Sequence, residues 1–429
     1  MLASWLLVSL VLAPIHAPQG ETVQSGGGLP PASPECGTLM QSCVQTTLDV
    51  TYYATAEAYQ TCPHGGPHDE RDYNKMNVYM PQFRSVCAPT VIWLHSGGWS
   101  TGFSGAQKDE PFNVALCSSL AASGFPVLDC NYYLSCFDPC IETPPGSADP
   151  LRTVRDVKRI INWVRTTGQG PAWCLPSEIV IAGSSAGGHL AVMMAATQGP
   201  GETTFDPPEV QDYSVQLAIA FSSPFDFISQ GCNGTQIPLD AFGMPRCDPL
   251  STCFPTCGGM PSYVRSLPTP RAYPCPGEGV CLGGNFQEVF LGRIWRPDRD
   301  PLNITKNGIT YLYDCSNYTH FPPMPTGNRW YDYSPLLWID GTEPPIYVFQ
   351  AACDGWMSSV QGQELFDRVS VLGGRCTLTT VEPDEELAPA CDPGYRHAAE
   401  GFSLDGSSLV AAKAANRIRD IILDEWSGW

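Results

Sequence analysis

The sequence is poor in charged residues, and above all in positively charged ones. Of its 429 residues only 15% are charged, and 23 Lys and Arg stand against 43 Asp and Glu, for a formal net charge of −20. Such an excess of negative charge repels phosphate backbones and anionic lipid headgroups. The composition therefore disfavours nucleic-acid binding, and no nucleic-acid partner is expected.

Three further features are missing, and each excludes a class of protein. Beyond the N-terminal segment, no apolar run is long enough to span a bilayer. The 19 cysteines are scattered and lack two tight C-x-x-C pairs, so disulfides are expected rather than a zinc site. No glycine-rich phosphate-binding fingerprint occurs, and no cofactor is expected. Because the cysteine count is odd, at least one thiol is free or pairs outside the chain.

The N-terminus is typical of an exported protein. Residues 1–17 hold an apolar run too short for a membrane helix and end in small residues, as a secretory signal peptide does. Sequons at Asn233, Asn303 and Asn317 fit the same route as glycosylation sites. The sequence therefore predicts a secreted glycoprotein with disulfides, whose cleavage site and disulfide connectivity stay open.

Strand-like and helix-like segments alternate along most of the chain. After an irregular lead-in over 18–45, strands are expected at about 46–54, 74–81, 90–96, 125–133, 178–184, 215–223, 344–353 and 376–382. Helices are expected at about 151–168, 186–197, 358–374 and 407–426. This alternation predicts an α/β fold with a mostly parallel sheet covered on both faces, in two core segments, 46–227 and 334–429. Between them, 228–333 is rich in cysteine and proline, which predicts an insertion or lid.

The pattern G-x-S-x-G occurs twice, around Ser100 and around Ser185. Small residues on both sides of the serine let the backbone turn sharply between a buried strand and a helix, which exposes a nucleophile. The buried run EIVIAGS precedes Ser185, and an apolar helix follows it at once. Ser100 is followed by FSGAQKDEPF, whose glycine, charges and proline predict no helix. We therefore expect Ser185 to be the nucleophile and Ser100 to be a chance match.

These segments resemble an α/β-hydrolase of the HGG-motif carboxylesterase group, close to the feruloyl and acetyl-xylan esterase (BD-FAE-like) branch. The matching segments are NVYMP, VIWLHSGGW, VLDCNYY, DVKRIINWV, IVIAGSSAGGHLA, PPIYVFQAACD and GYRHAAEGF. The resemblance implies an α/β-hydrolase fold and an oxyanion hole built from the N–H groups of Gly97, Gly98 and Ala186. The family usually has HGGGW, so Ser96 at the first glycine position leaves the geometry of this loop open.

A serine nucleophile of this kind is followed along the chain by an acid and then a histidine. Asp354 lies directly after the expected strand 344–353, where the family has its acid. Asp392 is the alternative, and Glu364 lies in an expected helix where we predict that it is solvated. His397 is the only histidine after Asp354. The predicted triad is therefore Ser185, Asp354 and His397.

The other conspicuous side chains have structural interpretations. His189 lies one helical turn after Ser185 and is expected to be a buried, hydrogen-bonded group, whereas His95 is expected to brace the oxyanion loop. Cys353 and Cys391 flank the acid and the base, and a disulfide between them could join the two loops. Partners elsewhere are an equally good interpretation.

This set of residues favours a secreted serine hydrolase that cleaves a small-molecule or polysaccharide-linked ester through an acyl-enzyme. Two alternatives stay open: an interaction protein that has lost catalysis on the same fold, and a peptidase or amidase with the same triad. Because His397 must be neutral to act as a base, activity should fall below about pH 6. Neither the substrate nor the oligomeric state can be predicted from the sequence.

Overall fold

The structure is a computed structural model of the whole chain. It describes residues 43–54, 73–82, 88–99, 107–134, 150–166, 178–198, 205–207, 212–227, 333–351, 359–381 and 408–426. It also describes four short strands within 273–312. Three residues singled out from the sequence, Ser100, Asp354 and His397, lie outside the described residues.

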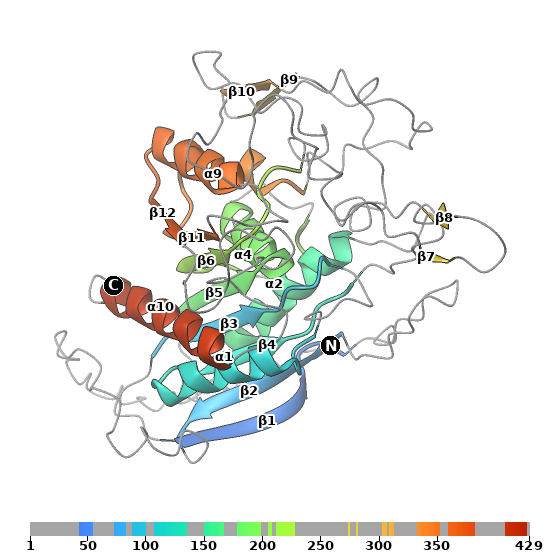
Figure 1. The fold of residues 1–429 in the computed structure, drawn as a ribbon, viewed down its shortest axis with the longest axis vertical. Helices are drawn as coiled ribbons and strands as arrows, with labels where there is room; N and C mark the ends of the chain where they lie inside the picture. The colour runs from blue at the N-terminus through green and yellow to red at the C-terminus, as the bar shows by residue number, and fades with distance from the viewer. Residues whose placement is uncertain are drawn as a thin grey trace, which may run out of the picture.

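An eight-stranded sheet forms the centre of the molecule, in the order β1-β2-β4-β3-β5-β6-β11-β12 (Figure 1). The strands are β1 (Val44–Thr51), β2 (Lys75–Pro81), β3 (Thr90–Leu94), β4 (Val127–Cys130), β5 (Ile179–Ser184), β6 (Leu217–Phe221), β11 (Ile346–Ala351) and β12 (Cys376–Val381). The pairs β1–β2 and β2–β4 are antiparallel, and all other neighbours are parallel. The predicted, mostly parallel sheet is confirmed.

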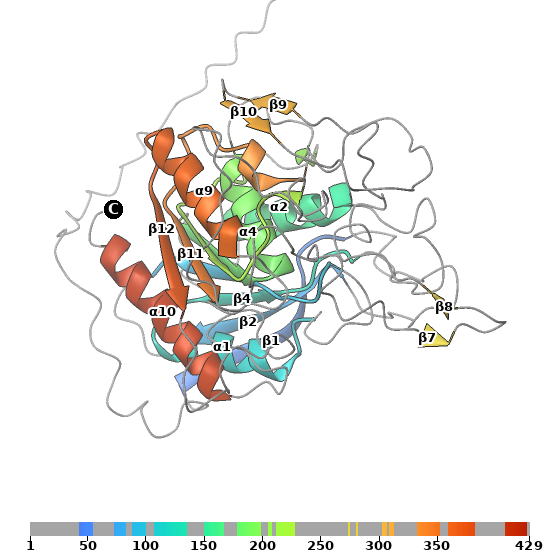
Figure 2. The same cartoon turned by 45° about the horizontal axis from the view of Figure 1, so that its top comes forward.

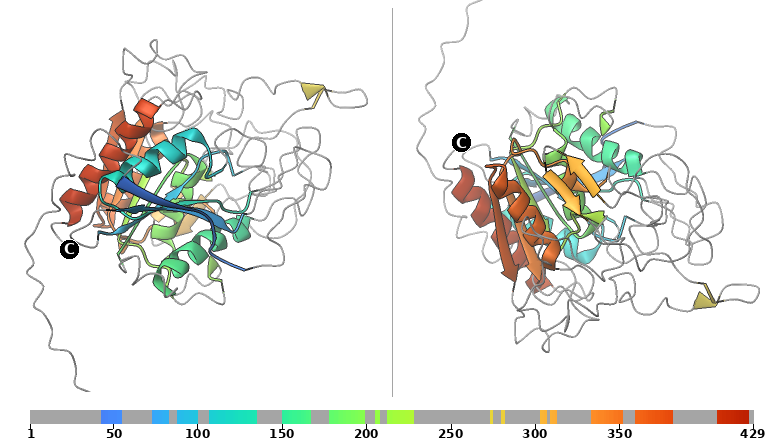
Figure 3. Two further views of the ribbon diagram at one scale, coloured as in Figure 1. Left: turned by 90° about the horizontal axis from the view of Figure 1, so that it is seen from below. Right: turned by 90° about the horizontal axis from the view of Figure 1, so that it is seen from above.

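Helices cover both faces of this sheet (Figure 3). On one face lie α1 (Pro111–Ala122) and α10 (Ser408–Trp426), and on the other α2 (Pro150–Thr166), α4 (Ala186–Ala196) and α9 (Ser359–Val371). Figure 2 shows α9 and α10 on opposite sides of β11 and β12. A hydrophobic cluster lies on each face of the sheet. Strand β3 contributes to both, because Ile92 and Leu94 belong to one cluster and Val91 and Trp93 to the other.

Helix α1 corrects the sequence analysis, which predicted no helix in FSGAQKDEPF. The helix begins at Pro111, inside that stretch, with proline at its first position. Proline is tolerated there because the first N–H groups of a helix have no intrahelical partner. The buried residues Phe112, Leu116, Cys117 and Leu120 follow helical spacing, a signal that the neighbouring charges and serines obscured.

The predicted insertion, 228–333, falls almost wholly outside the described residues. Two antiparallel pairs are described within it: β7 (Tyr273–Pro274) with β8 (Val280–Cys281), and β9 (Asn303–Lys306) with β10 (Ile309–Leu312). Neither pair was predicted from the sequence. The sequons at Asn233 and Asn317 lie outside the described residues, and Asn303 is the first residue of β9. The role of this segment as a lid stays a prediction.

Four cysteines in the described part of the chain can be assigned a state. Cys43 is disulfide-bonded, whereas Cys117, Cys130 and Cys376 are free. The three thiols agree with the expectation that at least one cysteine is free or pairs outside the chain. The bridge considered between Cys353 and Cys391 lies outside the described residues. Among the described helices, none combines the length and apolar character that crossing a bilayer requires.

Candidate active site

Ser185 lies on a sharp turn between β5 and α4. Its backbone has φ 51° and ψ −117°, a conformation rarely adopted by a residue with a side chain. Two hydrogen bonds fix the turn: the Ser185 N–H donates to the Phe221 carbonyl at 2.8 Å, and the His189 N–H donates to the Ser185 carbonyl at 3.0 Å. Backbone strain of this kind persists only where the surroundings hold it in place, and it is common at catalytic residues.

The glycines around Ser185 are required by close backbone contacts. A Cβ atom on Gly183 would lie 2.4 Å from the Gly187 carbonyl carbon. A Cβ atom on Gly187 would lie 2.0 Å from the Leu94 carbonyl oxygen and 2.6 Å from that of His95. The first turn of α4 therefore packs directly on the end of β3. This contact places Ser185 and Ala186 beside the loop that follows β3.

That loop, residues 95–99, has an unusual backbone. Gly97, Gly98 and Trp99 have φ values of 105°, 62° and 54°. Glycine suits the first two positions because it adopts positive φ without steric cost. Ser96 does not have a positive φ. A glycine is thus not needed at position 96, and the serine that replaces the family's first glycine is compatible with the loop.

His95 and Tyr132 support this loop through hydrogen bonds and ring stacking. His95 is fully buried, and its Nδ1 lies 2.7 Å from the Ser96 carbonyl oxygen. The Tyr132 hydroxyl donates to the His95 carbonyl at 2.7 Å, and the two rings stack with centroids 4.2 Å apart. His95 therefore has the bracing role that the sequence predicted. Tyr132 was missed, because an aromatic residue after a strand looks like any core residue.

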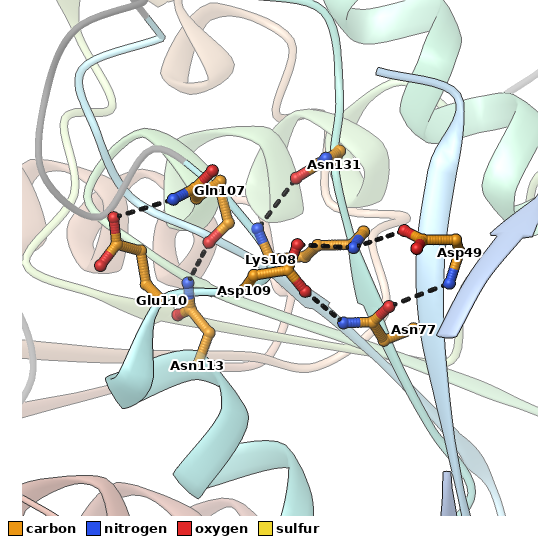
Figure 4. Close-up of polar contacts among 8 residues, drawn as sticks. All are labelled: Asp49, Asn77, Gln107, Lys108, Asp109, Glu110, Asn113 and Asn131. Atoms are coloured by element: carbon orange, nitrogen blue, oxygen red, sulfur yellow. Dashed lines mark hydrogen bonds and ion pairs between the residues drawn. The ribbon is translucent and has the colours of Figure 1, made fainter. Parts of the chain in front are cut away.

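A polar network surrounds residues 107–110, directly before α1 (Figure 4). The Lys108 ammonium group is 2.9 Å from Asp49 and 2.8 Å from Asp109, and it is almost fully buried. Burial alone would lower the pKa of Lys108, but hydrogen bonds and charge from the two carboxylates outweigh it and raise that pKa.

The same network reaches β2 and the end of β4. The Asn77 amide donates to Asp109 at 2.8 Å, and the Lys108 N–H donates to the Asn131 side chain at 2.9 Å (Figure 4). Asn131 and Tyr132 are consecutive, so one short segment after β4 supports both ends of the stretch 95–108. Sequence reasoning missed this network, because buried and exposed charge clusters look alike in a sequence.

His189 does not have the environment of a catalytic base. Its ring is fully buried, and its Nε2 lies 2.8 Å from the Tyr333 carbonyl oxygen. Burial lowers the pKa of His189 to about 3, so the ring stays neutral at ordinary pH. This agrees with the expectation that it is a buried, hydrogen-bonded group.

Glu364 corrects a second prediction. It was expected to be solvated, but it is buried at 5% exposure on α9. The buried face of α9 also carries Gln361 and Arg368, whose side chains bond to backbone groups of neighbouring loops. These polar residues lie on the buried face of α9. Because polar residues at helical spacing are usually exposed, the sequence pattern alone does not indicate that this face is buried. The alternative acid Asp392, like Asp354 and His397, lies outside the described residues.

Comparison with known proteins finds a family, curated relatives and solved structures that are similar to this chain. Residues 76–241 match the BD-FAE family model. The probable carboxylic ester hydrolase LipM of Mycobacterium tuberculosis is 29% identical over 184 residues, which cover 42% of this chain and 37% of the relative. The kynurenine formamidase of Salmo salar is 30% identical over 131 residues, which cover 30% of this chain and 37% of the relative.

The chain spans about a third of the length of these curated relatives. Esterase B from Lactobacillus Rhamnosis has a similar fold, with a TM-score of 0.51 at 16% identity, over 90% of this chain and 87% of that one. The family match contains both the glycine loop and Ser185. Residues 76–241 are therefore similar to the BD-FAE family, and the fold resembles that of esterase B.

Proposed function

We propose that the protein hydrolyses carboxylic esters, with Ser185 as its nucleophile. The observation that carries the proposal is the strained turn at Ser185, packed through Gly187 on the glycine loop after β3. An acyl-transfer site needs this combination, because the serine oxygen must reach the carbonyl carbon while N–H groups bind the carbonyl oxygen of the same substrate. Similarity to a probable carboxylic ester hydrolase over 184 residues supports the choice of ester bonds.

The mechanism follows from the roles of these groups. His397 takes the Ser185 hydroxyl proton as Oγ attacks the ester carbonyl, and Asp354 holds the imidazole in the required tautomer. The N–H groups of Gly97, Gly98 and Ala186 stabilise the negative oxygen of the tetrahedral intermediate. The alcohol leaves with the proton from His397, and water, activated by the same histidine, then cleaves the acyl-enzyme.

The test compares the two serines that share the same sequence pattern. The Ser185→Ala variant should lose p-nitrophenyl acetate hydrolysis and covalent labelling by a fluorophosphonate, measured by intact mass. Ser100→Ala is the matched control and should keep both. Labelling of Ser185→Ala but not of Ser100→Ala would reverse the assignment.

The catalytic base gives an independent test through pH. Activity should fall below about pH 6, as a histidine with an ordinary pKa becomes protonated. His397→Ala should remove activity and Asp354→Asn should reduce it strongly, while Asp392→Asn should leave it near the wild-type level. An acidic limb that stays flat in the wild-type protein would contradict a histidine base.

Secretion belongs to the same proposal. The segment 1–17 is proposed as a signal peptide, and Asn233, Asn303 and Asn317 as glycosylation sites. Expression in a eukaryotic secretory host, followed by N-terminal sequencing and glycosidase treatment, tests both points. A retained N-terminus, or a mass unchanged by the glycosidase, would contradict them.

One similarity favours a second candidate reaction. The kynurenine formamidase of Salmo salar is 30% identical over 131 residues, and the proposed triad chemistry can cleave amides as well as esters. Comparing p-nitrophenyl acetate with a formamide of an aromatic amine would separate the two activities. A kcat/KM higher for the formamide would make amide hydrolysis the main function.

A further inference from the structure

We propose that His189 is a positioning residue that ties the oxyanion loop to the two chain ends from which the segment 228–332 departs. We call these two ends the neck: residues 225–227 and 333–337. The proposal rests on the proposed function, because it assigns a role in the oxyanion hole. It concerns only residues that the structure describes.

Hydrogen bonds join the two halves of the neck. The Phe227 N–H donates to the Ser334 hydroxyl at 2.9 Å, and the Leu336 N–H donates to the Phe225 carbonyl at 3.0 Å. The Gln361 side chain on α9 accepts from the N–H groups of Phe225 and Asp226 at 2.7 and 2.6 Å. The two bonds to Gln361 attach the first half of the neck to α9.

His189 contacts both halves of the neck. Its ring stacks on Phe227, with centroids 4.7 Å apart and the planes inclined by 24°. Its Nε2 donates to the Tyr333 carbonyl oxygen at 2.8 Å, which fixes the proton of the neutral ring on Nε2 because the carbonyl can only accept. The two contacts come from residues more than 100 positions apart, so the ring adds a third connection between the halves.

The same ring also contacts the oxyanion loop. Trp99, which follows the glycine pair, meets His189 edge to face, with centroids 5.1 Å apart and the planes at 88°. Trp99 also packs edge to face on Phe227 at 5.4 Å, and it is fully buried with a positive φ. A loop residue in such a conformation needs tertiary support. His189, on α4, and Phe227, in the neck, supply that support.

The connection does not depend on protonation at ordinary pH. Burial keeps the imidazole neutral, so the donated hydrogen bond and both ring contacts persist over the pH range of activity. The contacts described for this ring are with aromatic rings and one backbone carbonyl. His189 therefore acts through packing and position, and not by moving a proton.

The expected consequence is specific to the transition state. Oxyanion donors act mainly on the charge that develops during the reaction, so a displaced loop lowers kcat more than it changes KM. Within the part of the chain that the structure describes, a break in the neck should reach the loop through the ring of His189 and its partner Phe227. The neck and the loop are then energetically coupled, which a double-mutant cycle can measure.

Three variants test the proposal in full-length protein. His189→Ala should lower kcat for p-nitrophenyl acetate by about tenfold or more with KM within about twofold. His189→Phe keeps a ring against Trp99 and Phe227 and should restore kcat to within about threefold. Ser334→Ala opens one bond of the neck and should lower kcat in the wild-type background, with a smaller effect in His189→Ala.

Two further measurements separate this role from others. Phe125→Leu is the matched control, a fully buried aromatic residue two positions before β4 begins, and it should lower the melting temperature without changing kcat. The acidic limb of the pH profile should be the same in His189→Phe and wild type. Loss of that limb would make His189 the base and overturn the proposal.

Hydrogen exchange gives a readout that needs no substrate. Amides of residues 96–99 should exchange faster in His189→Ala and Ser334→Ala than in wild type or Phe125→Leu. If wild-type protein hydrolyses no ester, the proposed function fails, and the exchange data still decide whether the loop depends on the neck. Unchanged exchange at 96–99, with kcat no lower than in Phe125→Leu, would overturn the proposal.

Discussion

Gly187→Ala offers a quantitative test of the contact between the nucleophile turn and β3. The added Cβ would lie 2.0 Å from the Leu94 carbonyl oxygen and 2.6 Å from that of His95. Both atoms belong to the backbone of a buried strand and its adjoining loop, so no flexible side chain can move aside. The first turn of α4 must therefore shift by about 1 Å or more, and a displacement of this size at reacting groups costs about 100-fold in rate.

The same clash has a separate cost in stability. Overpacking in a close-packed region destabilises by about 1–3 kcal/mol. Gly124→Ala is the matched control, because Gly124 has φ 105° and a Cβ there would meet nothing within 4 Å. Its cost is backbone strain alone, of about 1–3 kcal/mol, before the start of β4 and away from the strand end that holds the site.

The assay measures kcat/KM for p-nitrophenyl acetate and the free energy of unfolding for both variants, well below their melting temperatures. Both should lose similar stability, but only Gly187→Ala should lose activity. If Gly187→Ala kept activity within about fivefold of Gly124→Ala, the position of α4 against β3 would not set the geometry of catalysis, and the reasoning would be wrong.

Three further predictions follow from buried polar groups. Tyr132→Phe removes the bond to the His95 carbonyl, so unfolding by urea should show a loss of about 1–3 kcal/mol and kcat should fall with KM little changed. Asp129 is fully buried, its carboxylate has no hydrogen-bond partner among the described residues, and burial raises its pKa far above 3.8. The wild-type protein therefore loses stability as pH rises above about 4. In urea unfolding, the stability of Asp129→Asn relative to wild type should grow from about pH 4 to about pH 8, and a constant difference would contradict this. Lys158 is fully buried and pairs with Asp206 at 2.7 Å, so Lys158→Met should cost about 3 kcal/mol, a size that a surface ion pair would not reach.

The strand and helix on either side of Ser185 could be predicted because their signals are local. A buried strand, a G-x-S-x-G turn and an apolar helix are contiguous around Ser185, and each is typical of its structure. The loop at 95–99 has the same property, since its glycine pair marks the two positions where positive φ is needed. Strand locations were therefore predicted to within a few residues.

What could not be predicted depends on contacts between distant segments. Whether Lys108 lies in solvent or between Asp49 and Asp109 is decided by the position of β1, which no local pattern records. The burial of Glu364 depends in the same way on what packs over α9. Helix α1 was missed for a different reason, since its charged and proline-containing start hid an otherwise regular apolar spacing.

The neck also bears on how such a protein can diversify. The residues on either side of 228–332 adjoin each other, with the Phe227 N–H 2.9 Å from the Ser334 hydroxyl. A chain that leaves and re-enters a core at one point can be lengthened, shortened or exchanged there without altering the register of any strand. The sheet and the turn at Ser185 can thus be inherited unchanged while the length and sequence of the segment between the two ends vary.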